Sequence, residues 1–362
     1  IVKQGGRIEV DLSGSSRQAR TCINAGPLDV KTAVGAAFKL MVDRKTPFTS
    51  GAYRPIDIVI PPGTVMSAMP PDGAIMLYWE LSQALLTAIA RELSHALGDE
   101  AFGGDYGSVA VHNAHGVYPD GRPWQNIAIV GGEHGPWGAD QHHDGDSYAV
   151  PYMVNGLDPA TEAMEQESPV LLMRKEYVTD SGGPGRNRGG AGVLKDAYWE
   201  TAGEHYSIPI RYKRGTGNGV QGGGTGRAGA CWLFEPDDPA MQHADRLLPI
   251  DDSIYAATTP IAGVLDPATK ALDPNGEYFY FARQDVWHTQ PGAGSRYITN
   301  GGGGFGNPFE RAPEKVCDDV RNGYVSLGQA REAYGVAING DPDLDPEGLV
   351  IDEAETRRLR RR

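Results

Sequence analysis

The chain has 362 residues and a formal net charge of −14, with 40% hydrophobic and 22% charged residues. This composition is typical of a globular protein with one large domain or two or three smaller ones. The negative charge argues against nucleic-acid binding, because phosphate backbones would be repelled, and no uninterrupted apolar run approaches the roughly 18 residues of a membrane span.

Two residue types stand out in the composition. The 49 glycines are about twice the usual share, and glycine is used where the backbone needs a positive φ or must approach another group closely. We therefore expect many sharply shaped loops. The three cysteines, Cys22, Cys231 and Cys317, lie far apart and form no CxxC pair, which is typical of reduced thiols in a cytoplasmic protein.

The first hundred residues have clear periodic patterns. Residues 8–12 alternate apolar and polar as in a half-buried strand, 28–44 have apolar residues at helical spacing, and 56–60 alternate again before a Pro-Pro-Gly turn. From 75 to 97 there is no proline or glycine and a glycine follows, so this segment is the clearest helix. Residues 1–100 are predicted to be a mixed α/β portion with a long helix.

The pattern changes beyond residue 100. Between 101 and 310, short apolar runs alternate with clusters of glycine, proline and aspartate, which is typical of strands. Helical patterns return in 311–362, where Pro313, Ser326 and Gly335 supply start and stop signals. The predicted fold class is α+β: a helix-containing N-terminal part, a β-rich middle with glycine-rich loops and a short helical C-terminal tail.

The strongest local motif is DSGGPGRNRGG at residues 180–190, in which glycines flank Arg186 and Arg188. Consecutive backbone N–H groups can form an anion-binding concavity, and guanidinium groups match carboxylate or phosphate groups bidentately. One interpretation is a catalytic loop with Asp180, Ser181, Arg186 and Arg188 as its functional residues. The alternative is a structural crossover in which Asp180 pairs internally with an arginine.

Two further glycine-rich segments, 214–226 and 301–307, lack the lysine of a phosphate loop. The first of them also lacks the strand, turn, helix and downstream acid of a dinucleotide fingerprint. We therefore expect no ATP site and no other bound cofactor on this chain. There is also no GxSxG sequence that would indicate a nucleophile elbow.

Histidines and carboxylates gather around residue 140. The residues of this stretch that could bind a ligand are Glu133, His134, His142, His143, Asp144 and Asp146. Imidazole and carboxylate can bind zinc, manganese or iron, but the spacing matches no helical pair. We assign His134, Asp144 and Asp146 to substrate binding and no residue to a metal, with plain surface histidines as the alternative. His112 and His115 are a weaker metal candidate.

Several segments, taken in chain order, form one pattern. It consists of DLSGSSRQ at 11–18 followed by Asn24, GAYRPI at 51–56, the 180–190 motif, GGGGFGN at 301–307 and the tail from 319 to 336. This pattern resembles the hydantoinase B/oxoprolinase family over essentially the whole chain. The 180–190 motif, which matches the family's DSGGxGrxRGG block, is its most specific part.

The resemblance implies a B-type subunit that works with an A-type, hydantoinase A-like partner. The partner binds ATP and magnesium and phosphorylates a carbonyl oxygen of a small-molecule substrate. The implied activity is an ATP-dependent amidohydrolase that opens a hydantoin, oxoproline or other lactam ring by cleaving a C–N bond. A subunit of an acetone/acetophenone-type ketone carboxylase is the first alternative, and a non-catalytic scaffold is the second.

The sequence departs from the family pattern in two ways. The family's upstream part, with an NDPYxGGTH-like segment and a histidine/aspartate pair, has no counterpart here. We therefore expect that the native subunit continues upstream of Ile1 and that any divalent metal is bound in that part. Residues 65–70 also replace a proline-rich stretch, and His134, His142 and His143 lie outside the family pattern, which could favour the carboxylase branch.

Overall fold

The computed structural model describes residues 1–75, 78–107, 110–127, 134–152, 160–209, 213, 217–243, 245–273, 276–282 and 286–361. The chain divides into two compact units, Ile1–Phe102 and Gly103–Arg362. Helices and sheets occur together, so the α+β class predicted from the sequence is confirmed.

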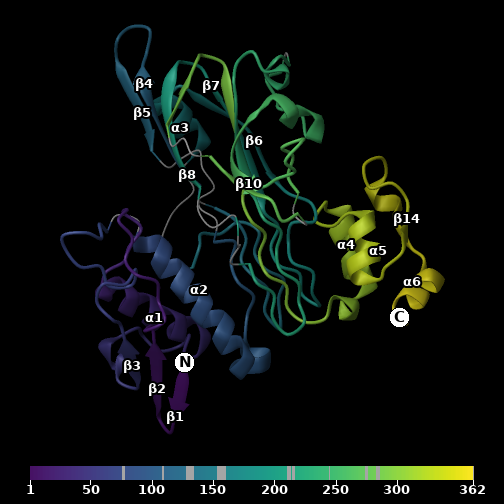
Figure 1. Cartoon of the computed structure of the whole chain (residues 1–362). Helices are drawn as coiled ribbons and strands as arrows, with labels where there is room; N and C mark the ends of the chain where they lie inside the picture. Colours follow the sequence, from purple (N-terminus) through teal and green to yellow (C-terminus); the bar gives the residue numbers. More distant parts are fainter. Residues whose placement is uncertain are drawn as a thin grey trace. The chain divides into compact units, whose positions relative to one another are not determined.

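The first unit combines a three-stranded sheet with two helices (Figure 1). Strands β1 (Val2–Gln4) and β2 (Arg7–Asp11) form an antiparallel hairpin, and β3 (Ile56–Val59) lies parallel to β2. The connection between these parallel strands contains helix α1 (Pro27–Met41), which packs against the long helix α2 (Tyr78–Leu97). The short 3-10 helices of this unit are η1 (Ser50–Tyr53) and η2 (Gly98–Glu100).

Helix α1 forms where the sequence has both a start signal and an apolar stripe. Pro27 stands in the first turn, where a missing N–H costs no helical hydrogen bond. The Asp29 carboxylate accepts a hydrogen bond from the Gly26 N–H at 2.9 Å. The buried side chains recur at helical spacing and are Val30, Ala33, Val34, Ala37, Phe38 and Met41. The helix predicted over 28–44 is therefore confirmed.

The second unit contains two larger sheets whose strand pairs are all antiparallel. One has the order β11-β10-β9-β13-β7-β6 and the other β12-β8-β4-β5. Their strands are β4 (Ala110–Val117), β5 (Pro123–Ile127), β6 (Val170–Tyr177), β7 (Val193–Trp199), β8 (Gly203–Pro209), β9 (Ala230–Phe234), β10 (Thr259–Val264), β11 (Phe279–Phe281), β12 (Val286–Thr289) and β13 (Ala293–Ile298). Helix α3 (Thr161–Glu167) precedes β6, and 3-10 helices η3 (Pro239–Met241) and η4 (Asp252–Ala257) precede β10.

The two sheets pack face to face through buried aromatic residues. Trp124 of β5 stacks on Trp199 of β7, with ring centroids 6.1 Å apart, and Val170 of β6 joins the same buried cluster. Trp199 also contacts the ring of His205 from β8 edge-on, at 4.6 Å. Because these side chains come from both sheets, one buried core of the second unit lies between the sheets, whereas another packs η3 and η4 against β7, β9 and β13 of the six-stranded sheet.

Extended segments that belong to no helix and few strand pairs form a tightly packed bundle in the second unit, visible in Figure 1 as long neighbouring traces. We call this the glycine bundle; it comprises residues 103–106, 135–146, 181–192, 217–229 and 301–306. Backbone N–H groups of one segment donate to carbonyls of another: Gly183 to Gly302 at 2.8 Å and Gly304 to Gly224 at 2.9 Å.

Glycine is required in this bundle because the backbones approach so closely. A Cβ on Gly189 would lie 2.0 Å from the Gly302 oxygen, and one on Gly303 would lie 2.0 Å from the Asn218 oxygen. Neither glycine has a positive φ. At these two positions glycine is therefore needed because two backbones approach each other closely, and not because the backbone adopts a positive φ. The composition had predicted sharply shaped loops instead.

The C-terminal residues form the predicted helices. They are α4 (Pro313–Arg321), α5 (Leu327–Tyr334) and α6 (Glu353–Leu359), with η5 (Pro308–Glu310), η6 (Pro346–Gly348) and the small strands β14 (Ile338–Asn339) and β15 (Val350–Ile351). The Ser326 side chain caps α5 by accepting a hydrogen bond from the Gln329 N–H, and Gly335 ends this helix with φ 63°. The start and stop signals predicted at these two residues are confirmed. In the two-unit division, these helices belong to the second unit.

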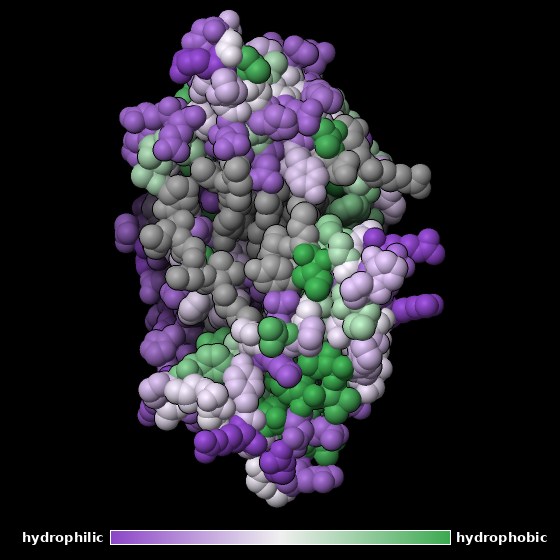
Figure 2. Space-filling model, turned by 90° about the vertical axis from the view of Figure 1, so that its left-hand side faces the viewer, coloured by the Kyte–Doolittle hydropathy of each residue, from purple (hydrophilic) through white to green (hydrophobic). Residues whose placement is uncertain are grey.

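Apolar side chains also reach the surface. Leu28 at the start of α1 is 76% exposed, and Ile23 and Ile75 are each 46% exposed. Figure 2 shows one face on which hydrophobic residues gather among hydrophilic ones. Within the described ranges, no helix combines the length and the apolar character needed to cross a membrane.

Candidate functional site

The 180–190 motif crosses the glycine bundle, and its first two residues hold the crossover in place. Asp180 has a left-handed φ of 61°, and its carboxylate accepts a hydrogen bond from the Ser326 N–H at 2.8 Å. The buried Ser181 hydroxyl donates to the Val178 oxygen at 2.5 Å and accepts from the Gly192 N–H at 2.7 Å. Within the described residues Asp180 does not pair with an arginine, so that part of the structural alternative is wrong. Its carboxylate instead binds the backbone N–H of Ser326, the N-cap residue of α5.

Arg188 belongs to a cluster of four charged side chains, here called the charge cluster: Asp144, Arg188, Arg311 and Asp319. Its guanidinium donates from Nε to Asp319 Oδ1 at 3.3 Å and from Nη1 to the Gly189 oxygen at 2.8 Å. Arg311 binds Asp144 bidentately at 2.7 and 2.8 Å and donates from Nε to Asp319 at 2.9 Å. The structure thus brings together two predicted site residues, Asp144 and Arg188. Arg311 and Asp319, which link their side chains, were not predicted from the sequence.

Burial and mutual charge shift the pKa values of Asp144, Arg311 and Asp319 in this cluster. Burial opposes ionisation of Asp144, but Arg311 and then Arg188 outweigh it, so the pKa of Asp144 lies below its ordinary value. Burial raises the pKa of Asp319 above its ordinary value, although Arg188 and Arg311 act in the opposite direction. Burial by itself would lower the pKa of Arg311, but Asp144 and Asp319 outweigh burial, so this pKa lies above its ordinary value. A buried arrangement of this kind is costly to break, because removing one partner leaves an uncompensated charge.

Arg186 has different surroundings, although it is only two residues from Arg188. Its side chain is 42% exposed and lies 3.9 Å from Glu310 Oε2, with the guanidinium 5.5 Å from the Phe305 ring centre. Its backbone oxygen accepts a hydrogen bond from Arg311 Nη1 at 3.1 Å. Of the two guanidinium groups in the motif, that of Arg186 is therefore the one that solvent and small anions reach more easily.

The other predicted ligand-binding residues do not join this arrangement. His134 is buried and stacks on Tyr148, with ring centroids 5.2 Å apart, whereas the Asp146 side chain is exposed. Glu133 lies outside the described residues. The roles predicted for His134 and Asp146 remain predictions, and their geometry does not connect them with Asp144.

The exposed histidines of the same stretch line a turn. The backbone N–H groups of His142 and His143 both donate to Asp140 Oδ1 at 2.8 Å, so the Asp140 carboxylate organises this loop. In the part of the chain that the structure describes, no three or more His, Cys, Asp or Glu side chains gather as a metal site.

Two polar residues of the family-like segments, Gln18 and Asn24, form hydrogen bonds within the first unit. The buried Asn24 side chain accepts from the Ala19 N–H at 2.8 Å and donates to the Ala74 oxygen at 3.1 Å. Gln18 accepts from the Met69 N–H at 2.8 Å and donates to the Met69 oxygen at 3.0 Å. These two side chains therefore hold the loop before α1 against the loop after β3.

A buried polar chain between the two sheets was not predicted from the sequence. His112 Nε2 lies 2.9 Å from His205 Nδ1, and His112 Nδ1 lies 2.8 Å from the Tyr297 hydroxyl. The chain continues from Tyr297 to Ser207 at 3.1 Å and from His205 Nε2 to Thr289 at 2.8 Å. Every member can both donate and accept, so a directed row of hydrogen bonds can form with both histidines neutral.

Burial keeps this histidine pair uncharged near neutral pH. It lowers the pKa of His112 well below its ordinary value, with a further contribution from His205. It also lowers the pKa of His205 to about 4, helped by the charge of His115. A strand places residues three apart on opposite faces, which explains why His112 is buried while His115 is exposed. That alternation is visible in the sequence, but the partners of His112 are not.

The chain is similar to known proteins in both sequence and structure. The model of the family described as hydantoinase B/oxoprolinase matches residues 1–308. The caprolactamase subunit beta of Pseudomonas jessenii is 27% identical over 311 residues, 83% of this chain and 46% of that protein. The acetone carboxylase alpha subunit of Xanthobacter autotrophicus is 23% identical over 379 residues, 99% of this chain and 47% of that protein. The 5-oxoprolinase 1 of Arabidopsis thaliana is 26% identical over 238 residues, 64% of this chain and 17% of that protein.

Two solved structures share the fold. Nucleotide-free acetone carboxylase superposes with a TM-score of 0.76 at 20% identity, over 98% of this chain and 46% of that chain. The ATP-dependent caprolactamase of Pseudomonas jessenii superposes with a TM-score of 0.71 at 23% identity, over 99% of this chain and 55% of that chain. The chain spans about half the length of the curated relatives first matched. The resemblance inferred from the motifs is confirmed: the chain belongs to the hydantoinase B/oxoprolinase family.

Proposed function

We propose that this chain is part of the B-type subunit of an ATP-dependent amidohydrolase, which opens a hydantoin, oxoproline or other lactam ring together with an ATP-binding A-type subunit. The observation that carries the proposal is the family match over residues 1–308. Relatives named caprolactamase subunit beta and 5-oxoprolinase point to cyclic amides as the substrate class. Three unpaired cysteines, two of them buried, suit a cytoplasmic complex.

Backbone N–H groups in the described parts of the glycine segments already have internal acceptors, which supports placing ATP and magnesium on the partner. The N–H groups of Gly183, Gly303 and Gly304 already donate to backbone carbonyls at 2.8–2.9 Å. The three glycine-rich segments also contain no lysine, which a phosphate loop would use at the β- and γ-phosphates. ATP bound to the A-type subunit would activate the substrate carbonyl by phosphorylation. Binding of a divalent metal by the B-type subunit remains a prediction.

In this proposal Arg186 contacts the anionic group of the activated substrate or a developing oxyanion. Its planar guanidinium is exposed, which such a contact requires. The charge cluster acts as positioning machinery, because Arg311 binds both the Arg186 backbone oxygen and Asp144. Asp180 and Ser181 fix the start of the same loop from the other end.

The test is product analysis of the reconstituted complex. The intact B-type subunit and its A-type partner would be incubated with ATP, magnesium and hydantoin, 5-oxoproline or caprolactam. We expect one of these rings to be opened with ATP consumption that requires both subunits. Ring opening by the A-type subunit alone, or no opened ring from any cyclic amide, would exclude the proposal.

A ketone carboxylase subunit is a second candidate, because the similarity to acetone carboxylase extends over 99% of the chain. The same complex supplied with bicarbonate and acetone or acetophenone would then give a carboxylated product. A non-catalytic scaffold is a third candidate, since Asp180, Ser181 and Arg188 all have internal partners. Unchanged turnover in an Arg186 variant would favour the scaffold.

A further inference from the structure

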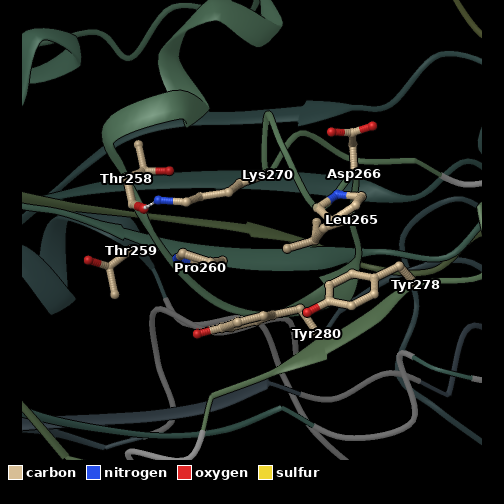
Figure 3. Close-up of a pocket in the computed structure, with 9 residues that line it drawn as sticks. Thr258, Thr259, Pro260, Leu265, Asp266, Lys270, Tyr278 and Tyr280 are labelled. Atoms are coloured by element: carbon tan, nitrogen blue, oxygen red, sulfur yellow. Dashed lines mark hydrogen bonds between the residues drawn. The ribbon is translucent and has the colours of Figure 1, made fainter.

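A pocket of about 330 Å³ opens where strands β10 and β11 form one edge of the six-stranded sheet (Figure 3). It is lined by Thr258, Thr259, Pro260, Leu265, Asp266, Pro267, Lys270, Tyr278 and Tyr280. This volume falls within the range of small-molecule sites. The lining combines one ammonium group with hydroxyl groups, two phenol rings and apolar side chains, so it can recognise both a charge and a ring.

Lys270 is held in an unusual conformation at this pocket. Its backbone φ is 61°, a left-handed value that costs free energy for a residue with a side chain. Its carbonyl accepts a hydrogen bond from Trp232 Nε1 at 3.3 Å, and its Nζ donates to the Thr258 oxygen at 3.2 Å. Contacts at both ends of the residue therefore fix the ammonium group at the pocket.

The carboxylate that shares the pocket is already committed to its own turn. Asp266 accepts hydrogen bonds from the Ala268 N–H at 2.9 Å and the Thr269 N–H at 2.7 Å. An ammonium group has three donors, and within the described residues Lys270 uses one of them, toward Thr258. Lys270 therefore has donors left for an incoming anion.

The opposite side of the pocket is aromatic. Figure 3 shows Lys270 and Thr258 on one side of Pro260, and the rings of Tyr278 and Tyr280 on the other. Tyr280 packs against the buried core of the sheet, which keeps its ring in place. A flat or puckered ring can lie against these phenol faces while an acidic group reaches Lys270.

We propose that this pocket binds a small cyclic carboxylate, with its carboxylate on the Lys270 ammonium and its ring against Tyr280 and Tyr278. The inference is independent of the ATP-dependent activity proposed above, because no residue of the 180–190 motif or of the charge cluster lines the pocket. The left-handed φ of Lys270 belongs to the turn that this residue closes, in which its N–H donates to the Asp266 oxygen at 2.8 Å.

The test uses benzoate as the probe and isothermal titration with the whole 362-residue chain. We expect benzoate to bind the wild type at millimolar concentrations and to bind Lys270→Met about ten-fold more weakly or worse, because the charge-assisted hydrogen bond is lost. Lys270→Gly separates binding from folding, since glycine adopts a positive φ without strain. This variant should keep the wild-type melting midpoint and still lose benzoate. Lys315→Met, at an exposed position of α4, is the matched control and should bind as the wild type does.

Benzyl alcohol, which has the same ring without the charge, separates recognition of the carboxylate from apolar binding. It should bind the wild type more weakly than benzoate does. Three results would overturn the proposal: no benzoate binding at tens of millimolar, equal binding of benzoate by wild type and both Lys270 variants, or equal binding of benzoate and benzyl alcohol.

Discussion

Arg186 and Arg188 are separated by one residue, yet they differ in burial and partners. The Arg188 side chain is 7% exposed and binds Asp319, whereas the Arg186 side chain is 42% exposed and lies near Glu310. An extended backbone would place both on the same face, so the difference comes from what covers that face. Tyr324 packs on the Arg188 guanidinium at 4.3 Å. The two arginines can therefore be separated experimentally.

Replacing each arginine by lysine should produce opposite effects. Arg188→Lys should lower the free energy of unfolding by about 1–3 kcal/mol, because lysine cannot bind Asp319 and the Gly189 oxygen with the same fork. The turnover of its folded fraction should fall much less than that of Arg186→Lys, because Arg188 only positions the loop. Arg186→Lys should keep the melting midpoint but reduce turnover by on the order of 10²–10³ if it binds an oxyanion. Denaturant titration and turnover of the reconstituted complex measure both effects.

Arg331→Lys is the matched control, because Arg331 is 49% exposed and paired with Glu355. It should change neither quantity by much. Near-normal turnover in Arg186→Lys, or a loss that follows unfolding in both variants, would contradict a catalytic role for this loop.

At the scale of elements, the glycine bundle depends on backbones that touch. Gly189→Ala and Gly303→Ala should each lower the free energy of unfolding by about 1–3 kcal/mol or more, because the new methyl group would meet a backbone oxygen that cannot rotate away. The added Cβ would lie 2.0 Å from that oxygen in both cases. Gly14→Ala is the control, since nothing lies within 4 Å of its added Cβ. Equal midpoints for all three variants in urea would contradict close packing as the reason for these glycines.

The buried histidine pair makes the packing of the two sheets sensitive to acid. Both pKa values lie below the ordinary value of about 6.5, so below that pH the unfolded chain binds more protons than the folded chain. The pair should therefore leave stability unchanged above about pH 6.5. Its contribution should fall by up to about 1.4 kcal/mol per histidine and pH unit as the pH is lowered. For His205 this loss continues to about pH 4.

Chemical denaturation at several pH values tests this dependence. The double variant His112→Gln, His205→Gln should show a shallower loss of stability than the wild type between these pH limits. His142→Gln removes an exposed histidine and should keep the wild-type slope. A double variant with the same slope as the wild type would show that the pair does not titrate on unfolding.

At the scale of the whole molecule, the chain by itself should bind Mg-ATP negligibly. The N–H groups of Gly183, Gly303 and Gly304 are used within the bundle, and the net charge of −14 opposes a further polyanion. Isothermal titration of the chain alone with Mg-ATP measures this, with the reconstituted complex as the positive control. Micromolar binding to the isolated chain would contradict the placement of ATP on the partner.

Local patterns were enough to predict several elements and the family. The apolar stripe and Pro27 predicted α1, and Ser326 and Gly335 predicted the limits of α5, because a helix repeats every 3.6 residues and its ends need particular caps. The 180–190 motif indicated the family because it is a contiguous run of letters. Each of these inferences depends on residues that are neighbours in the sequence.

Only the tertiary structure decided what the charged and histidine residues do. Arg311 meets Asp144 across 167 positions, Arg188 meets Asp319 across 131, and His112 meets Tyr297 across 185. No periodicity links such distant positions. The sequence therefore did not decide whether Arg188 acts in a catalytic loop or in a structural crossover, and it did not indicate Arg311 at all. The same holds for the glycines: the sequence determined that backbones could approach closely, whereas the fold decided which carbonyl lies where a Cβ would stand.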